Sequence, residues 1–400
     1  MMLPAPFIFV GYGMDKLLRS TTSGISMRKN LSPGIIAVLF MISLGSLLLV
    51  GFGGIFEQKF DLFYRSNIIY SILVHNNWPI IDFTKFQYLS YYLGYFLVPA
   101  LLVKFFGLNS FLNIELIINT FILFSIFILF FLRFKNFYFL LFLIPSSMFW
   151  LFEKHFLGIN TGFRYFNFLN VLAHGPQQLF PCLLGLIYFL FGKNDLIKKS
   201  FPFFFSLLFF WSPFSVIGLS VLYSAYFFRF KINLLNLFGA IIFFVLLLFF
   251  IGKASPIYFR FIDFSTEGLS YLLFILFDII LLIVLFKPQF SVQYLVVTFF
   301  LILLPFFHFG KHNDLLTKSS IPALMFFYYW ILNHSRSTYI NVLRIIFLLI
   351  FSITSLNQLF NILHPYQGAQ DVLVKMKNKS FLNYYDQEVQ DQDRKSTRLN

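Results

Sequence analysis

Long apolar runs follow one another along nearly the whole chain, and short polar stretches separate them. A helix needs about 20 consecutive apolar residues to cross a hydrocarbon layer roughly 30 Å thick. The pattern therefore predicts an all-α fold, a polytopic bundle of about eleven transmembrane helices. The predicted helices cover approximately residues 34–54, 109–132, 136–152, 178–192, 200–212, 213–228, 232–252, 269–286, 289–308, 321–334 and 339–360. Several are short for a full crossing, which predicts broken or tilted helices.

The polar positions divide the chain into three parts. Residues 1–33 form an expected cytoplasmic segment, 34–360 the transmembrane domain, and 361–400 a polar tail. Within the domain, residues 55–108 form a large loop that is expected on the outer side. Residues 394–400 resemble a translated cloning or sequencing scar and are excluded from the fold reasoning.

Composition agrees with a membrane protein. Hydrophobic residues make up 59% of the chain and charged residues 12%, whereas soluble domains carry about 25% charged residues. The single cysteine, Cys182, excludes an intramolecular disulfide and a cysteine-based metal site. No Gly-rich nucleotide loop, Rossmann fingerprint or zinc-protease motif occurs, so a nucleotide-driven reaction is not expected.

The net charge of +14 indicates topology rather than a nucleic-acid partner. Cytoplasmic loops of membrane proteins carry an excess of Lys and Arg. With the N-terminus inside, the basic segments 133–135, 198–199 and 229–231 all face the cytoplasm only if the apolar segment 88–107 does not cross. We therefore expect 88–107 to be an interfacial helix in the outer leaflet.

The same topology places the longest and most polar loops on one face, outside the cytoplasmic membrane. These loops are 55–108, 153–177, 253–268 and 309–320. The inner connections are short and basic. The active face is therefore expected outside, in a multi-pass inner-membrane protein.

Asp61 is the first candidate for chemistry, because it follows the first predicted span by a few residues and can act as a general base on a hydroxyl group. The alternative is an ordinary solvated loop acid. Arg65, four residues later, could pair with Asp61 or bind a phosphate. Asp82 is the rival catalytic acid and follows the Trp78-Pro79 turn. Arg65, Trp78 and Asp82 are candidates for substrate binding.

The order of these features resembles the GT-C superfamily of membrane glycosyltransferases, which includes protein mannosyltransferases and lipid A aminoarabinose transferases. The order is an acid after the first span, the Trp78-Pro79 turn, an apolar helix from Tyr88, and Gly107 before the second span. The resemblance implies that Asp61 is the catalytic acid and that the helix lies along the membrane. It also implies a polyprenyl-phosphate sugar as donor and a glycan, lipid or protein as acceptor.

The chain departs from the family in one respect. Many members carry an acidic pair, whereas Asp61 is followed by Leu62. No metal ligand is therefore assigned, and a divalent cation stays an open alternative. His312 and Asp314 could contribute to a metal site, but two ligands without a third are weak evidence.

Two later segments offer groups for a sugar or phosphate. The first runs from His174 to Gln178, with His174 and Gln177 as its candidates, and its alternative role is a polar helix cap with Pro176 near the first turn. The second concentrates cations and hydrogen-bonding groups and could hold a lipid phosphate or be only a hydrated turn. Its candidates are Lys311, His312, Asp314 and Lys318.

A second class of function stays open. A transporter or flippase of a glycolipid or polysaccharide precursor would use Asp278, which lies inside a predicted span, as a proton site. Such proteins often contain internal repeats, and the sequence shows no clear repeat. An enzyme is therefore the preferred interpretation, with Asp278 as a structural hydrogen-bonding group. A polysaccharide polymerase is a third alternative.

Overall fold

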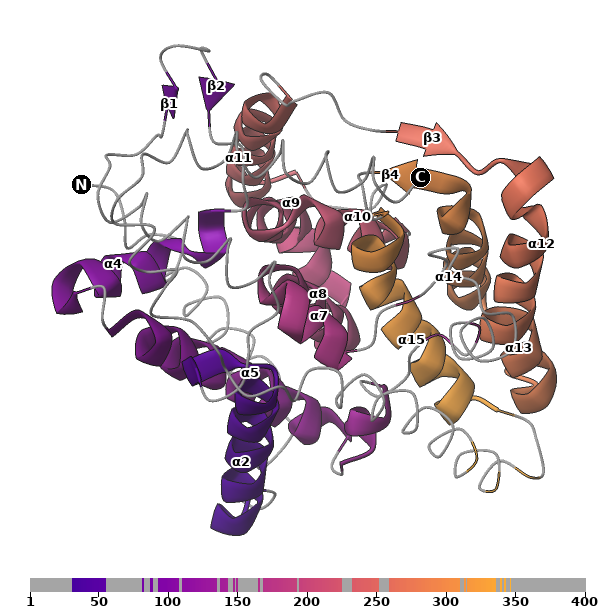
Figure 1. Ribbon diagram of the computed structural model, residues 1–400, viewed down its shortest axis with the longest axis horizontal. Coiled ribbons are helices and arrows are strands. Elements are labelled where there is room, and N and C mark those ends of the chain that lie inside the picture. Colours follow the sequence, from indigo (N-terminus) through magenta and orange to yellow (C-terminus); the bar gives the residue numbers. More distant parts are fainter. Residues whose placement is uncertain are drawn as a thin grey trace, which may run out of the picture.

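The computed structural model is predominantly helical in the part of the chain that it describes, which confirms the expected helical class (Figure 1). The number of membrane crossings stays a prediction. The described residues are 31–54, 81–82, 87–88, 93–107, 110–134, 137–142, 147, 149, 165, 168–192, 194–224, 232–251, 259–309, 313, 315–335, 339, 342 and 346.

The observed helices include a counterpart of each predicted helix up to residue 334, although several of their ends differ by more than a few residues. They are α2 (Pro33–Leu49), η2 (Phe52–Gly54), η3 (Leu93–Tyr95), α4 (Leu97–Phe106), α5 (Phe111–Phe134), η5 (Phe137–Phe142), α7 (Phe168–His174), α8 (Pro176–Phe191), α9 (Asn194–Trp211), α10 (Pro213–Leu222), α11 (Leu234–Ile251), α12 (Phe264–Ile275), η8 (Leu276–Ile280), α13 (Leu281–Phe286), α14 (Val292–Leu303), η9 (Leu304–Phe306), η10 (Leu315–Ser319) and α15 (Ser320–Asn333). Helices α7 and η10 are not among the predicted helices, and they lie in the predicted loops 153–177 and 309–320. Most of the predicted helix 339–360 lies outside the described residues.

Proline and a small polar residue mark where helices begin. In α2, the hydroxyl of Ser32 accepts a hydrogen bond from the Ile35 N–H at 3.3 Å, and Pro33 occupies the first turn. Ser212 and Pro213 repeat this arrangement in α10. A hydroxyl at the cap satisfies an N–H that has no partner within the helix, and proline has no N–H to lose there. The sequence thus fixes these ends locally.

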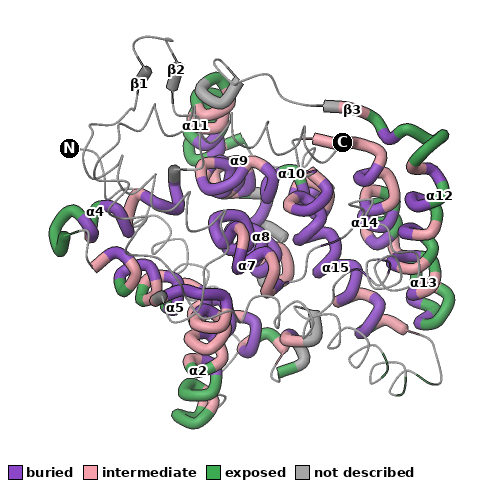
Figure 2. Tube along the Cα trace, in the orientation of Figure 1, coloured by how far each residue is buried: buried purple, intermediate pink, exposed green. Residues whose placement is uncertain are grey.

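Three helices are long and apolar enough to cross a membrane, judged by length and composition. They are Phe111–Phe134, Phe264–Phe286 and Leu315–Asn333, and further apolar helices of 10–17 residues accompany them. An exposed apolar stripe runs along the second of them, with one residue at every third or fourth position (Figure 2). It consists of Leu269, Leu272, Leu276, Ile280 and Val284. Soluble monomers rarely expose apolar surface of this extent, so these helices are compatible with a membrane protein.

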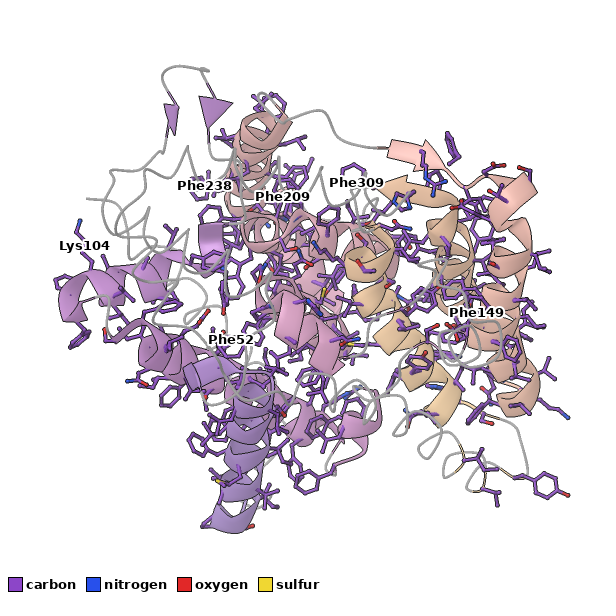
Figure 3. All side chains as sticks on the ribbon, viewed as in Figure 1. Phe52, Lys104, Phe149, Phe209, Phe238 and Phe309 are labelled. Atoms are coloured by element: carbon purple, nitrogen blue, oxygen red, sulfur yellow. The ribbon has the colours of Figure 1, made fainter. Side chains whose placement is uncertain are left out.

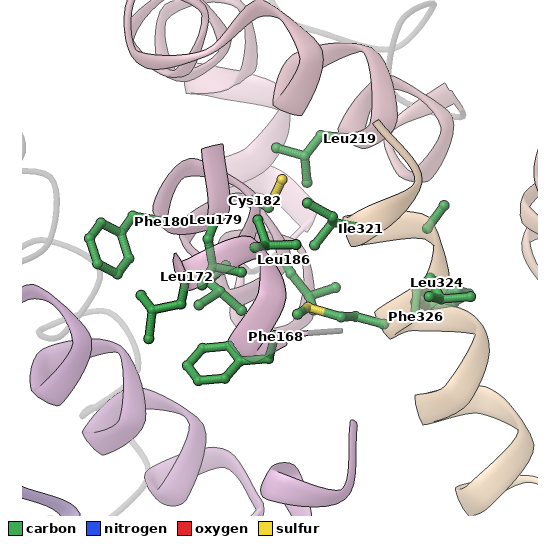
Figure 4. Packing of buried hydrophobic residues seen from close by; sticks show 14 of the residues in the cluster. Phe168, Leu172, Leu179, Phe180, Cys182, Leu186, Leu219, Ile321, Leu324 and Phe326 are labelled. Atoms are coloured by element: carbon green, nitrogen blue, oxygen red, sulfur yellow. The ribbon is translucent and has the colours of Figure 1, made fainter. Parts of the chain in front are cut away.

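Helices α7 and α8 lie at the centre of the bundle, between α5 on one side and α10 and α15 on the other (Figure 1). Side chains of α8, α10 and α15 interdigitate in the core, among them Cys182, Leu219 and Ile321 (Figure 4). Gly185 lets α8 approach α10 closely, because a Cβ at this position would overlap the side chain of Leu219. Small residues at helix contacts are typical of membrane bundles.

Two pairs of short strands were not expected from the sequence. Strand β1 (Ile81–Asp82) pairs antiparallel with β2 (Gln87–Tyr88), and β3 (Phe259–Phe261) pairs antiparallel with β4 (Phe307–Phe309). The predicted helix 289–308 is therefore wrong at its end. Helical structure stops at η9, which contains Pro305, and the chain continues as a strand.

The corner where β3 meets α12 is held by charged groups. Arg260 donates two hydrogen bonds to Glu267, at 3.0 and 2.7 Å. Asp263 caps α12, and hydrogen bonds from the hydroxyl and the N–H of Ser265 hold its pKa below the usual range. These contacts fix the β3–β4 ribbon relative to the first turn of α12.

Helix α4 covers part of the segment expected to be interfacial. It has 10 residues, so it is about 15 Å long and too short to cross a bilayer. It ends at Gly107, whose φ of 87° lies in the left-handed region that favours glycine. Phe105 and Phe106 are 77% and 71% exposed. Figure 3 shows Lys104 projecting from α4 at the edge of the molecule.

Candidate functional site

The N-terminal ends of α8, α10 and the η10–α15 helix meet at one end of the bundle. The hydroxyl of Ser215 in α10 donates a hydrogen bond to the Gln178 carbonyl in α8, at 2.8 Å. Gly218 of α10 packs directly on the backbone of Ser319 in η10. The macrodipole of a helix gives its N-terminus positive potential, which favours anions. The convergence therefore creates a region suited to a negatively charged group.

Lys318 adds a full positive charge to this region. Its Nζ atom lies 5.6 Å from the centroid of the Phe214 ring, which belongs to the first turn of α10. The same ring also contacts Phe309 in β4, at 5.7 Å between ring centroids. A lysine over an aromatic face is held by a cation–π interaction. The ammonium group thus lies beside the α10 N-terminus.

Asn313 shapes the loop that leads into η10. Its φ is 50°, a left-handed conformation that asparagine tolerates better than most residues. Its Oδ1 accepts hydrogen bonds from the N–H groups of Leu316, at 3.3 Å, and Phe309, at 3.4 Å. One side chain thus caps η10 and ties it to β4, which sets where Lys318 lies.

The first turn of α8 carries two buried amides. The side chains of Gln177 and Gln178 are 2% and 1% exposed. Both fold back over Gly175, which caps the helix without a side chain, because a Cβ there would lie 3.6 Å from Gln178 Oε1 and 3.7 Å from Gln177 Nε2. The Oε1 and Nε2 atoms of Gln178 have no hydrogen-bond partner among the described residues.

A second polar cluster lies against the other side of α8. The Tyr95 hydroxyl donates to Asn119 Oδ1 at 2.8 Å, and Asn119 Nδ2 donates to the Glu115 carbonyl at 2.7 Å. The Tyr95 ring packs near Phe180 of α8 and Trp211 of α9, with centroids 6.3 and 6.5 Å apart. Glu115 is fully buried. This cluster brings η3 and α5 to the same end of the bundle as the three N-termini.

The structure places four of the candidate residues predicted from the sequence, and two of them lie at the convergence. Gln177 lies in the first turn of α8 and Lys318 in η10. His174 is the last residue of α7 and is partly buried just before Gly175. Asp82 lies in β1, where it pairs with Gln87. The candidates Asp61, Arg65, Trp78, Lys311, His312 and Asp314 lie outside the described residues.

Sequence reasoning missed Ser215 as part of this region, and it named the segments that contain Gln178 and Asn313 without singling out these two residues. Two adjacent glutamines look alike in sequence, and only the helix geometry shows that the Gln178 amide lies without a partner. Ser215 gave a weak signal, because it follows the Ser212-Pro213 helix start by a fixed interval. The glycine-proline step before the glutamines was the clearest sequence signal of the α8 end.

Among the described residues, no group of three or more His, Cys, Asp or Glu side chains could hold a metal ion. Asp278 is the buried acid of another region. Its carboxylate accepts hydrogen bonds from the Ser147 hydroxyl, at 2.5 Å, and the Phe149 N–H, at 3.0 Å. It lies in η8, a π-helical turn inside a long apolar helix. Such turns are frequent at functional sites.

No family model, curated protein or solved structure matches this chain.

Proposed function

We propose that the protein is a membrane glycosyltransferase of the GT-C type that moves a sugar from a polyprenyl-phosphate donor to an acceptor on the outer face of the cytoplasmic membrane. The observation that carries this proposal is the convergence of three helix N-termini and Lys318 at one end of an apolar bundle. A lipid-linked donor needs this combination. Its isoprenyl chain occupies the bilayer, and its phosphate requires positive potential at the surface.

The proposed reaction combines these groups with the candidate residues from the sequence. The oxygen of an acceptor hydroxyl attacks the anomeric carbon, and the bond between that carbon and the phosphate oxygen breaks. Asp61 accepts the hydroxyl proton. The polyprenyl phosphate leaves with increased negative charge, which Lys318 and the helix N-termini stabilise, joined by Arg65 and Lys311.

The proposed topology has about eleven spans with the N-terminus inside. Two contacts support the proposal that the loops assigned to the outer face lie on the same side of the membrane. Strands β3 and β4 join the segment 253–268 to the residues that precede 309–320, and the Tyr95–Trp211 contact joins the 88–107 segment to the end of α9. The length of α4 and its exposed phenylalanines support an interfacial position for this helix.

Binding of a lipid phosphate tests whether Lys318 and the converging helix N-termini hold the donor phosphate. Purified protein in lipid nanodiscs is titrated with citronellyl phosphate, a short isoprenyl phosphate. Lys318→Glu should weaken binding much more than Lys318→Arg, because only the first reverses the charge at the site. Lys104→Glu, on the exposed end of α4, is the matched control and should bind as the wild type does. Equal affinities in all variants would remove Lys318 from the proposal.

Asp278 favours a second candidate function. A carboxylate buried in a π-helical turn within an apolar helix suits a proton-coupled transporter or flippase of a glycolipid or polysaccharide precursor. In that case, proteoliposomes should move a fluorescent lipid-linked precursor between leaflets. Sugar transfer without such flux would favour the enzyme.

A further inference from the structure

The amide of Gln178 raises a question that phosphate binding does not answer. It is 1% exposed, and neither Oε1 nor Nε2 has a hydrogen-bond partner among the described residues. A buried polar group without a partner costs more than an ordinary hydrogen bond returns, so such groups in native proteins usually meet water or a ligand. The amide lies at the N-terminus of the 16-residue helix α8, folded over Gly175.

Helix α10 links this amide to the region around Lys318 that is proposed to bind the phosphate. The backbone carbonyl of Gln178 accepts the hydrogen bond from Ser215, and Lys318 lies over the ring of the preceding residue, Phe214. Helix α15 packs on both α8 and α10, and two more fully buried hydroxyls lie where η10 continues into it. Those of Ser319 and Ser320 likewise have no hydrogen-bond partner within the described ranges.

The chemistry of an amide limits what can satisfy it. Glutamine offers one acceptor oxygen and two N–H donors in a plane. The ionised phosphodiester of a lipid-linked sugar only accepts hydrogen bonds, so it could pair with Nε2 but would leave Oε1 facing an anion. A sugar presents donors and acceptors side by side, either as neighbouring hydroxyls or as an acetamido group. Both arrangements match the two ends of the amide at once.

We propose that Gln178 binds the sugar of the lipid-linked donor through a paired donor and acceptor, while Lys318 and the helix N-termini hold the phosphate. This inference rests on the proposed function and adds the group that recognises the sugar. The sugar and the phosphate of one ligand would then bind to neighbouring parts of the site. Sites built to hydrogen-bond a substrate hydroxyl discriminate strongly against ligands that lack it.

The test measures binding only, so it does not depend on transfer. Protein in nanodiscs is titrated with citronellyl phosphate and with its glucosyl, mannosyl and N-acetylglucosaminyl esters. In the wild type, at least one sugar ester should bind 10-fold or more tightly than the bare phosphate. In Gln178→Met, which keeps the length of the side chain but removes the amide, this ratio should fall to about 1 while bare phosphate still binds.

Gln293→Met is the matched control, because the Gln293 amide already donates to the Leu222 carbonyl at 2.8 Å. It should keep the wild-type ratio. The inference is overturned if no sugar ester binds more tightly than the phosphate, or if the ratio survives in Gln178→Met, which would assign the amide to ordered water. If sugar esters bind more tightly than the bare phosphate but no sugar is transferred, the proposed enzyme activity would be contradicted. The binding role of Gln178 would remain, as in a flippase.

Discussion

Gly218→Ala tests the helix contact that positions the candidate site. A Cβ at Gly218 would lie 1.9 Å from the carbonyl oxygen of Ser319 and 2.8 Å from Cγ of Pro322, whereas real Cβ contacts are essentially never under 3.0 Å. The backbone oxygen cannot rotate away, so α10 and η10 must separate by about 1.1 Å, the difference between 3.0 and 1.9 Å. Overpacking of this kind typically costs about 1–3 kcal/mol, and a rigid backbone contact favours the upper end.

The expected result is a lower unfolding midpoint in detergent, together with weaker citronellyl phosphate binding because the shift also displaces Lys318. Gly45→Ala in α2 is the control, since a Cβ there has nothing within 4 Å. Alanine in a helix interior is favoured over glycine by about 0.5–1 kcal/mol, so this variant should match or exceed the wild type. The reasoning would be refuted if Gly218→Ala were as stable as Gly45→Ala and bound the phosphate ester equally well.

Further predictions concern topology, the buried acid and pH. In a Cys182→Ser background, a cysteine replacing Arg164 should be labelled from outside and one replacing Lys198 should not; labelling of both from one side would contradict the topology. Asp278→Asn should keep folding and transfer, since an amide can still accept one hydrogen bond and donate another, whereas Asp278→Leu should lose about 1–3 kcal/mol for each hydrogen-bonding group left unsatisfied; loss of flux in Asp278→Asn with intact folding would favour the transporter. The pKa of Asp263 is lowered on folding, so its contribution to stability is present above about pH 4 and is lost as pH falls further. Asp263→Asn should flatten this acid dependence in thermal unfolding, and an unchanged profile would contradict the assignment.

The helices could be predicted from the sequence because long apolar runs leave few alternatives in a lipid environment. The strands could not. The residues of β3 and β4 look like the ends of apolar segments, and their pairing depends on two loops that are distant in sequence. The contact of Gly218 with Ser319 is equally non-local, so no sequence window reveals it.

The candidate site was predictable in part. Polar residues between apolar runs identified Gln177 and Lys318, which lie at the convergence of the helix N-termini. The role of Gln178 depends on which of two adjacent amides finds a partner after folding. The burial of Glu115 depends on how other helices pack on α5, and the position of an acid near a helix end does not predict it.

The most direct test of the central proposal is sugar transfer by the purified protein in liposomes, from a polyprenyl-phosphate sugar to an added acceptor. Removal of a general base typically lowers the rate about 10²–10⁴-fold. Wild-type protein and Asp82→Asn should transfer sugar, and Asp61→Asn should not, with equal amounts of folded protein in each. Full activity in Asp61→Asn would contradict the mechanism, and no transfer by the wild type together with flux of a lipid-linked precursor would contradict the enzyme itself.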